Sequence, residues 1–266
     1  MPECLYHYTS VETFLKILES KKVLFNRLDR VLDLTEGRSS DLGPLGIYQF
    51  VSCWTECPDE NLVLWGFYPS GLSGVRIALP RNMFETYEQA SERYQGLTME
   101  PALRHVLPLD ERIRDDLLVG PVPLEFPHQM VYTGDPDLLA PKVAEIPDTV
   151  EFGKLGVSKA PDWAFEQEWR FRLFVMPHPV PADRDFGSPS FAETVAPRVR
   201  EIFNSRRVRD THLFCSISHS ALEQMEVLLG PCTDTEERQC VEKALQTWNP
   251  SCTLSVSRYV GQIRCG

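Results

Sequence analysis

The stretch "LYHYTSVETFLKIL" (residues 5–18) decides how the fold begins, because its pattern changes from strand to helix within a few residues. Its first four residues are rich in aromatic side chains, which favour strands. Thr9 and Glu12 then match a capping box, in which a hydroxyl at the helix start is answered three residues later by a carboxylate. Apolar residues follow at helical spacing. The pattern predicts a strand that ends near His7, directly before a capped helix over residues 9–19, where ligands often meet backbone N–H groups.

Three later segments also have patterns that predict secondary structure. The segment "EWRFRLFVM" (residues 168–176) alternates apolar side chains on one face with arginines on the other, as a strand does. Residues 82–118 are interpreted as mostly helical, and "CTLSVSRYVGQIR" (residues 252–264) as a closing strand. Strands and helices are interspersed without regular βαβ repetition. This predicts a single α+β domain over residues 1–266 with a largely antiparallel sheet.

The composition is that of a globular protein with an acidic surface. The 266 residues are 42% hydrophobic, and 27 basic residues face 38 acidic ones, for a net charge of −11. Broad electrostatic binding of nucleic acid is therefore not expected. The one strongly basic run (residues 198–209) is interpreted as a solvated helix face. No apolar window approaches the roughly 20 residues of a membrane helix and the start lacks a signal-peptide layout, so we expect a cytoplasmic protein with no membrane partner.

Eight cysteines are scattered along the chain without a CxxC pair. Cys53 and Cys57 lie four apart, but no second close pair of Cys or His completes a zinc-type set. For a cytoplasmic protein we therefore expect free thiols and no metal site.

Polar residues gather where predicted strands begin or end: His7 and Thr9, then Ser52, then Glu166, Glu168 and Arg170. In an extended chain the two glutamates and Arg170 point the same way, since residues two apart share a face. Such a set is typical of a salt-bridge ladder on a solvated face, and it also suits a site that needs carboxylates.

The order of these motifs resembles a bacterial family known as domain of unknown function 2971, from residue 5 to about residue 263. One departure is visible, because the family tends to have an Asn-Asp-Pro-x-Glu stretch where this chain has "LDLTE" (residues 32–36). The matched features are residues 5–9, Asp33, Glu36, Ser52, Cys53, Trp65, Tyr68, residues 74–77, Lys159, Trp163, Glu166, residues 168–170, Gly230 and Pro231.

The opening stretch and the layout of three polar motifs also resemble the ADP-ribosyltransferase superfamily. The resemblance implies a split pair of small antiparallel sheets with flanking helices, which clasp NAD as substrate. It implies that His7 holds ribose hydroxyls, that Ser52 lines the nicotinamide pocket and that Glu168 is the catalytic carboxylate. The other residues expected to contact NAD lie beside these on the same strands: Tyr8, Thr9, Trp54 and Arg170.

The chemistry of NAD suits these residue types. Nicotinamide leaves as a neutral molecule, so the reaction needs no general acid; it needs a negative group beside the developing oxocarbenium ion, as in glycoside cleavage. One ionised glutamate meets that need, and Glu166 can orient or deprotonate an acceptor. Tyr6, Tyr8 or Trp54 can stack on the nicotinamide ring. The expected activity is transfer of ADP-ribose to a protein, nucleic-acid or small-molecule acceptor, or to water as an NAD glycohydrolase.

Two other hypotheses belong to different classes. The first is a non-catalytic nucleotide- or partner-binding module on the same fold, in which His7 and the glutamates are structural. The second is a thiol enzyme that uses Cys53 with a distant histidine, His128 or His219, although no feature of the sequence lowers the pKa of Cys53.

Overall fold

The computed structural model describes residues 3–88, 93–94, 97–98, 104–114, 116–123, 126–144, 151–177 and 208–265. Most of the basic run at residues 198–209 lies outside these ranges, so its interpretation as a helix face stays a prediction. No helix in the described ranges combines the length and the apolar composition needed to cross a bilayer.

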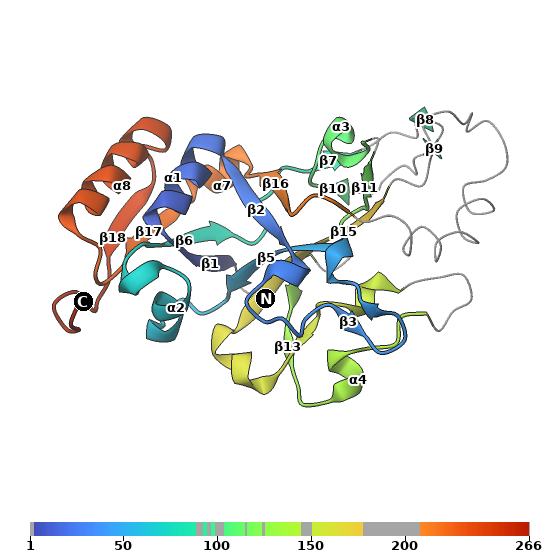
Figure 1. Ribbon diagram of the computed structural model, residues 1–266. Helices are drawn as coiled ribbons and strands as arrows, with labels where there is room; N and C mark the ends of the chain where they lie inside the picture. The colour runs from blue at the N-terminus through green and yellow to red at the C-terminus, as the bar shows by residue number, and fades with distance from the viewer. Residues whose placement is uncertain are drawn as a thin grey trace.

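One mixed sheet organises the described chain (Figure 1). Its strands follow the order β11-β15-β5-β1-β6-β17-β18, with β2 added to β5, β16 to β2 and β12 to β15. The ten strands are β1 (Cys4–Thr9), β2 (Lys22–Arg27), β5 (Gln49–Thr55), β6 (Val75–Pro80), β11 (Leu117–Val119), β12 (His128–Gln129), β15 (Glu168–Pro177), β16 (His212–Ser216), β17 (Glu226–Leu229) and β18 (Thr253–Val256).

The sheet consists of two halves that meet at one point. β1 pairs with β6 along its whole length, and β5 pairs with β15 over seven residues. Between β1 and β5 the described register holds one pair, Tyr6 with Thr55. The expectation of two separate antiparallel sheets is therefore corrected, because the halves are joined into one sheet. The pairing is largely antiparallel as predicted, but β17 and β18 run parallel.

The first helix follows its strand as expected, with a cap shifted by one residue. α1 (Val11–Ser20) begins after Ser10, whose hydroxyl accepts from the Thr13 N–H at 3.2 Å, so the predicted box from Thr9 is wrong. α1 packs against α8 (Thr235–Trp248), which has a full capping box between Asp234 and Glu237. The apolar faces of both helices join the main core of the sheet.

The remaining helices are short: α2 (Leu62–Phe67), α3 (Leu109–Arg112), α4 (Pro136–Leu139) and α7 (His219–Glu223). Five 3-10 turns lie in the described ranges: η1 (Leu28–Arg30), η2 (Gly46–Tyr48), η3 (Ser70–Leu72), η4 (Phe152–Lys154) and η5 (Pro161–Glu166). Two-residue strands pair apart from the main sheet: β3 (Arg38–Ser39) with β4 (Gly43–Pro44), β7 (Tyr87–Glu88) with β10 (Arg104–His105), β8 (Arg93–Tyr94) with β9 (Leu97–Thr98), and β13 (Val131–Tyr132) with β14 (Ser158–Lys159).

Three expectations need correction. The described parts of residues 82–118 hold short strands and the single turn α3, so the mostly helical interpretation is wrong. The closing strand is limited to β18, and the chain turns away after Val256. Cys232 and Cys265 form a disulfide across 33 residues, so the expectation that all cysteines are free thiols is also wrong. The other six are free.

Candidate functional site

A cavity lies where the two halves of the sheet diverge. Beyond the pair of Tyr6 with Thr55, the next residues of β1 and β5 form no further register pairs with each other. The His7 side chain spans the gap instead, with Nδ1 2.9 Å from the Cys53 carbonyl oxygen. The cavity has a volume of about 60 Å³ and is lined by Tyr6, His7, Tyr8, Cys53, Trp54, Thr55, Leu64, Tyr68, Glu166 and Glu168.

Glu168 lies at the start of β15 and is 2% exposed. Its backbone N–H donates to the Tyr132 hydroxyl at 2.8 Å, which fixes the entry into the strand. Its carboxylate accepts from Arg170 Nε at 2.6 Å and Nη2 at 2.9 Å, and from Lys159 Nζ at 3.2 Å. Burial opposes ionisation, but the two cations outweigh it and lower the pKa of Glu168 to about 2. Glu168 is therefore ionised at neutral pH.

Glu166 reaches the same cation by a different route. It ends η5, and Gln167 then takes a left-handed conformation at φ 44°, so the chain between the two glutamates is not extended as predicted. The Glu166 carboxylate accepts from Lys159 Nζ at 2.5 Å and from the Tyr68 hydroxyl. Burial, reinforced by the charge of Glu168, raises the pKa of Glu166 although Lys159 opposes it.

Carboxylates outnumber cations in the buried cluster around Lys159. Arg170, which is 0% exposed, forms an ion pair with Glu36 as well as with Glu168. Lys159 Nζ lies 3.5 Å from Glu36 and within ion-pair distance of both cavity glutamates. Three carboxylates thus share two cations, and all five residues are buried. A ladder on a solvated face is therefore excluded for this set.

His7 is half-buried and its ring faces the Trp54 ring at a centroid distance of 5.1 Å. Burial lowers the pKa of His7, although the bond to Cys53 opposes the shift. The imidazole is therefore neutral at pH 7. Since a carbonyl oxygen only accepts, Nδ1 carries the hydrogen, and Nε2 remains as an acceptor.

The structure brings five of the eight predicted site residues to the cavity: His7, Tyr8, Trp54, Glu166 and Glu168. Ser52 does not line it. Ser52 is paired with Phe171 on the face of the sheet opposite Glu168, and its hydroxyl accepts from Trp54 Nε1 at 2.9 Å. Thr9 is buried beside Val75, and Arg170 holds carboxylates behind the cavity wall. The structure thus does not bring these three residues to the cavity, and their contact with NAD stays a prediction.

The residues predicted to contact NAD did not include the lining residues Cys53, Thr55, Leu64 and Tyr68, nor the cation Lys159 behind them. The alternation along β5 is the signal that finds Cys53 and Thr55, because Cys53 is paired with Arg170, and Thr55 with Glu168, on one face. No local pattern points to Tyr68, since its hydroxyl meets Glu166 across 98 positions.

The thiol-enzyme hypothesis does not fit this geometry. Burial and the nearby charge of Glu168 raise the pKa of Cys53 well above its ordinary value, so the thiol keeps its proton. His7 bonds the Cys53 carbonyl oxygen, while His219 lies on exposed α7 beside Glu223. His128 is paired with Arg170 at the edge of β15.

Within the described residues no group of three or more His, Cys, Asp or Glu side chains is arranged to hold a metal ion. Searches among known protein families, curated proteins and solved structures found no match to this chain. The two resemblances noted in the sequence therefore stay predictions.

Proposed function

We propose that the cavity cleaves the nicotinamide–ribose bond of NAD⁺ and passes ADP-ribose to an acceptor or to water. The observation that carries the proposal is a pair of glutamates that line one cavity while their pKa values are shifted in opposite directions. Two carboxyl groups whose environments separate their proton affinities are typical of acid–base and glycosyl-transfer sites.

Each residue then has a role in this reaction. Ionised Glu168 stabilises the oxocarbenium-like transition state, and its bonds to Arg170 and Lys159 hold the carboxylate in place. Glu166, whose proton affinity is higher, takes a proton from the acceptor hydroxyl. On the other wall, His7 Nε2 accepts from a ribose hydroxyl.

The size of the cavity sets a condition on this reaction. About 60 Å³ holds roughly two water molecules, whereas a cavity that takes a benzene-sized ring measures about 150 Å³. A nicotinamide ring that lies fully inside the cavity therefore needs more space than the cavity has in this structure. Leu64 of α2 and Tyr68, which follows α2, belong to the cavity wall, and α2 has only six residues. Short elements of this kind open locally at low cost in free energy.

The test is release of nicotinamide from NAD⁺, followed by chromatography. Wild-type protein should release nicotinamide, and Glu168→Gln should release about 10²–10³-fold less. Glu166→Gln should lose transfer to an acceptor more than hydrolysis. The matched control is Glu223→Gln, which changes an exposed glutamate of α7 and should leave the release unchanged. Equal release by wild type and Glu168→Gln would refute the assignment of Glu168.

A non-catalytic binding module on the same fold is the second candidate, because the Glu168 carboxylate already accepts three hydrogen bonds from Lys159 and Arg170. A carboxylate held in this way also suits a purely structural role. Calorimetry with NAD⁺ separates the two candidates: binding with a fixed stoichiometry and no nicotinamide release supports the binding module.

A further inference from the structure

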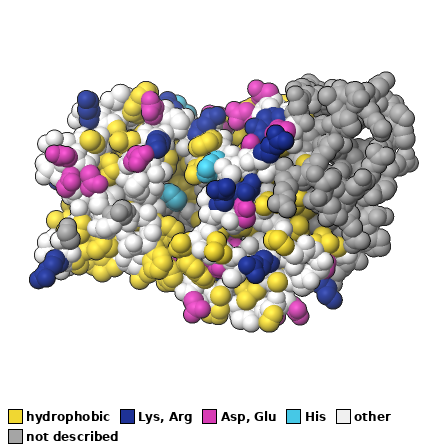
Figure 2. Space-filling view, in the orientation of Figure 1, with side chains coloured by type: hydrophobic (Ala, Val, Ile, Leu, Met, Phe, Trp, Pro, Cys, Tyr) yellow, Lys and Arg dark blue, Asp and Glu magenta, His cyan; other side chains and the backbone are white. Residues whose placement is uncertain are grey.

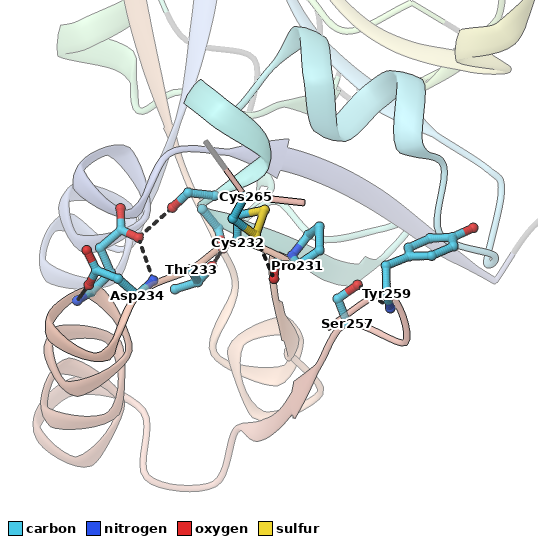
Figure 3. The surroundings of a disulfide bond; sticks show 10 residues. Pro231, Cys232, Thr233, Asp234, Ser257, Tyr259 and Cys265 are labelled. Atoms are coloured by element: carbon cyan, nitrogen blue, oxygen red, sulfur yellow. Dashed lines mark hydrogen bonds between the residues drawn. A yellow bond between two sulfur atoms is a disulfide. The ribbon is translucent and has the colours of Figure 1, made fainter. Parts of the chain in front are cut away.

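The disulfide fastens the end of the chain to the end of β17. Cys232 follows Gly230 and Pro231 directly after that strand, and Cys265 is the second-last residue. Figure 3 shows Cys265 brought against Cys232 beside Pro231, with Ser257 and Tyr259 of the same terminal segment nearby. We refer to residues 257–265 as the tail.

The tail has few other attachments beyond its first two residues. Every hydrogen bond described for residues 259–264 is to another residue of the tail. Ser257 is buried, whereas most of the following residues are half-buried or exposed. The disulfide is therefore the main constraint on the far end of the tail.

Glu60 connects the start of the tail to α2. Its carboxylate accepts from Ser257 Oγ at 2.5 Å and from the Arg258 N–H at 2.8 Å. The same carboxylate accepts from the indole Nε1 of Trp65 at 3.2 Å. Glu60 thus links Ser257 and Arg258 to Trp65, a side chain of α2.

Trp65 in turn supports the cavity wall. It is fully buried and packs edge-on against Tyr8 at a centroid distance of 4.8 Å. The Tyr8 hydroxyl accepts at 3.1 Å from the backbone N–H of Asn61, and Asn61 caps α2. Tyr8 and Leu64 both line the cavity. Within the tail, Gln262 Nε2 donates to the Arg258 carbonyl oxygen at 2.8 Å. The path from the disulfide to the cavity wall therefore runs along the tail to Arg258, and from there through Glu60 to Trp65.

We infer that the Cys232–Cys265 disulfide is a redox switch for the cavity: the bond holds α2 in the closed position, and its reduction lets α2 move and the cavity enlarge. The reductant is a dithiol. One of its thiolates attacks the disulfide, the second thiol resolves the mixed disulfide, and two electrons leave the dithiol as two cysteine thiols form on the protein. The inference rests on the proposed function only in its consequence, that the reduced form is the one that admits nicotinamide.

The experiment measures amide hydrogen exchange of residues 62–67 in the full-length protein, oxidised and after treatment with dithiothreitol. Thiol titration in denaturant should count six thiols before reduction and eight after it. Exchange in α2 should become about tenfold faster on reduction. Cys265→Ser and Cys232→Ser should each show the fast exchange without dithiol and no further change with it. Cys240→Ser, which removes an exposed free thiol of α8, should keep the slow exchange and its response to dithiol.

A count of eight thiols before reduction, or the same rate of α2 exchange in Cys265→Ser and wild type, would overturn the switch. Nicotinamide release separates this failure from a failure of the proposed reaction. Faster α2 exchange on reduction without any release of nicotinamide would leave the switch standing and refute the reaction. Equal release by the oxidised and reduced forms would mean that α2 does not gate the site, which would also overturn the inference.

Discussion

Glu166 and Glu168 are two positions apart, yet their surroundings shift their pKa values in opposite directions. Glu168 has Arg170 and Lys159 as partners, whereas Glu166 shares Lys159 with two other carboxylates. The sequence predicts that Glu168 and Arg170 share a face, because strand alternation is local. It does not predict that Lys159 and Glu36 complete the cluster, because 123 positions separate these two residues and only the fold brings them together.

Ser52 and Cys53 show how a single position decides which face of β5 a side chain occupies. The two residues are neighbours on β5, so their side chains lie on opposite faces of the sheet. The sequence prediction named Ser52, whereas Cys53, the next residue of the strand, lines the cavity. Pairing with Arg170 identifies Cys53 as the residue on the same face as the carboxylates.

Glu168→Gln should lower kcat for NAD⁺ cleavage by about 10²–10³-fold with little change in KM, because its charge acts chiefly in the transition state. His7→Ala should instead raise KM at least as much as it lowers kcat, since ribose contacts exist in the ground state. Steady-state kinetics on variants shown by thermal unfolding to be folded provides the measurement. A rise in KM alone for Glu168→Gln would contradict the proposed role.

Tyr68→Phe should move the acidic limb of the kcat/KM profile to higher pH. The Tyr68 hydroxyl donates to the Glu166 carboxylate and stabilises its ionised form, so its removal raises the pKa of Glu166 further. A base that must be ionised then becomes active only at higher pH. Tyr87→Phe removes a similar bond, from Tyr87 to Glu85 outside the cavity, and should leave the profile unchanged. An unshifted acidic limb in Tyr68→Phe would show that Glu166 is not the base.

At the scale of elements, long periodic segments were predictable and short paired ones were not. α1 and β15 each carry a sustained apolar period, and each forms within two residues of its predicted position. β7 and β10 have two residues each and form only by pairing with each other across 16 positions, from Glu88 to Arg104. Such pairs leave no local period, so the sequence of residues 82–118 does not predict them.

Ser10→Ala should destabilise the protein by about 1 kcal/mol, the usual loss for an N-cap hydroxyl. Ser10 Oγ accepts the Thr13 N–H, one of the donors that α1 leaves without an intrahelical partner. Urea denaturation followed by circular dichroism gives the free energy of unfolding. Ser20→Ala, which removes a hydroxyl at the exposed end of the same helix, is the control and should cost less. Equal losses in the two variants would contradict the assignment of Ser10 as the cap.

At the scale of the whole molecule, the sheet order creates the candidate site. Two halves that share one register pair must diverge on one side of it, and the residues at the divergence come from β1, β5, β15, η5 and the region of α2. Figure 2 shows hydrophobic side chains gathered on the lower part of this face, where α2 and the tail lie in Figure 1. The exposed apolar residues of that region include Leu62, Val63, Phe67, Tyr68, Val256 and Val260.

The sequence predicts the α+β class and the antiparallel pairing, since both follow from local patterns. It does not predict the parallel addition of β18 to β17, nor the disulfide, because both depend on where α8 and the tail return to the sheet. Cys232 and Cys265 lie 33 positions apart and form no spaced motif, so the bond has no signature in the sequence.

The buried cluster should also govern how the stability of the whole molecule depends on pH. The pKa of Glu168 is lowered from 4.5 to about 2 in the folded protein, so its contribution to stability is complete above pH 4.5 and is lost as the pH falls toward 2. At about 1.4 kcal/mol per pKa unit, the loss between pH 7 and pH 3 is about 2 kcal/mol. Glu166 has the opposite sign: its raised pKa stabilises the fold at low pH, and that contribution declines as the pH rises through the folded pKa.

Urea denaturation at pH 7 and at pH 3 should therefore show a smaller acid loss of stability in Glu168→Gln than in wild type, because the variant lacks the group that must be protonated. Glu166→Gln should show a larger acid loss than wild type, since it lacks the group whose protonation favours the fold. Glu223→Gln, in exposed α7, should follow wild type at both pH values. An acid loss in Glu168→Gln as large as that of wild type would mean that Arg170 and Lys159 do not hold Glu168 ionised, and the electrostatic basis of the proposed site would fail with it.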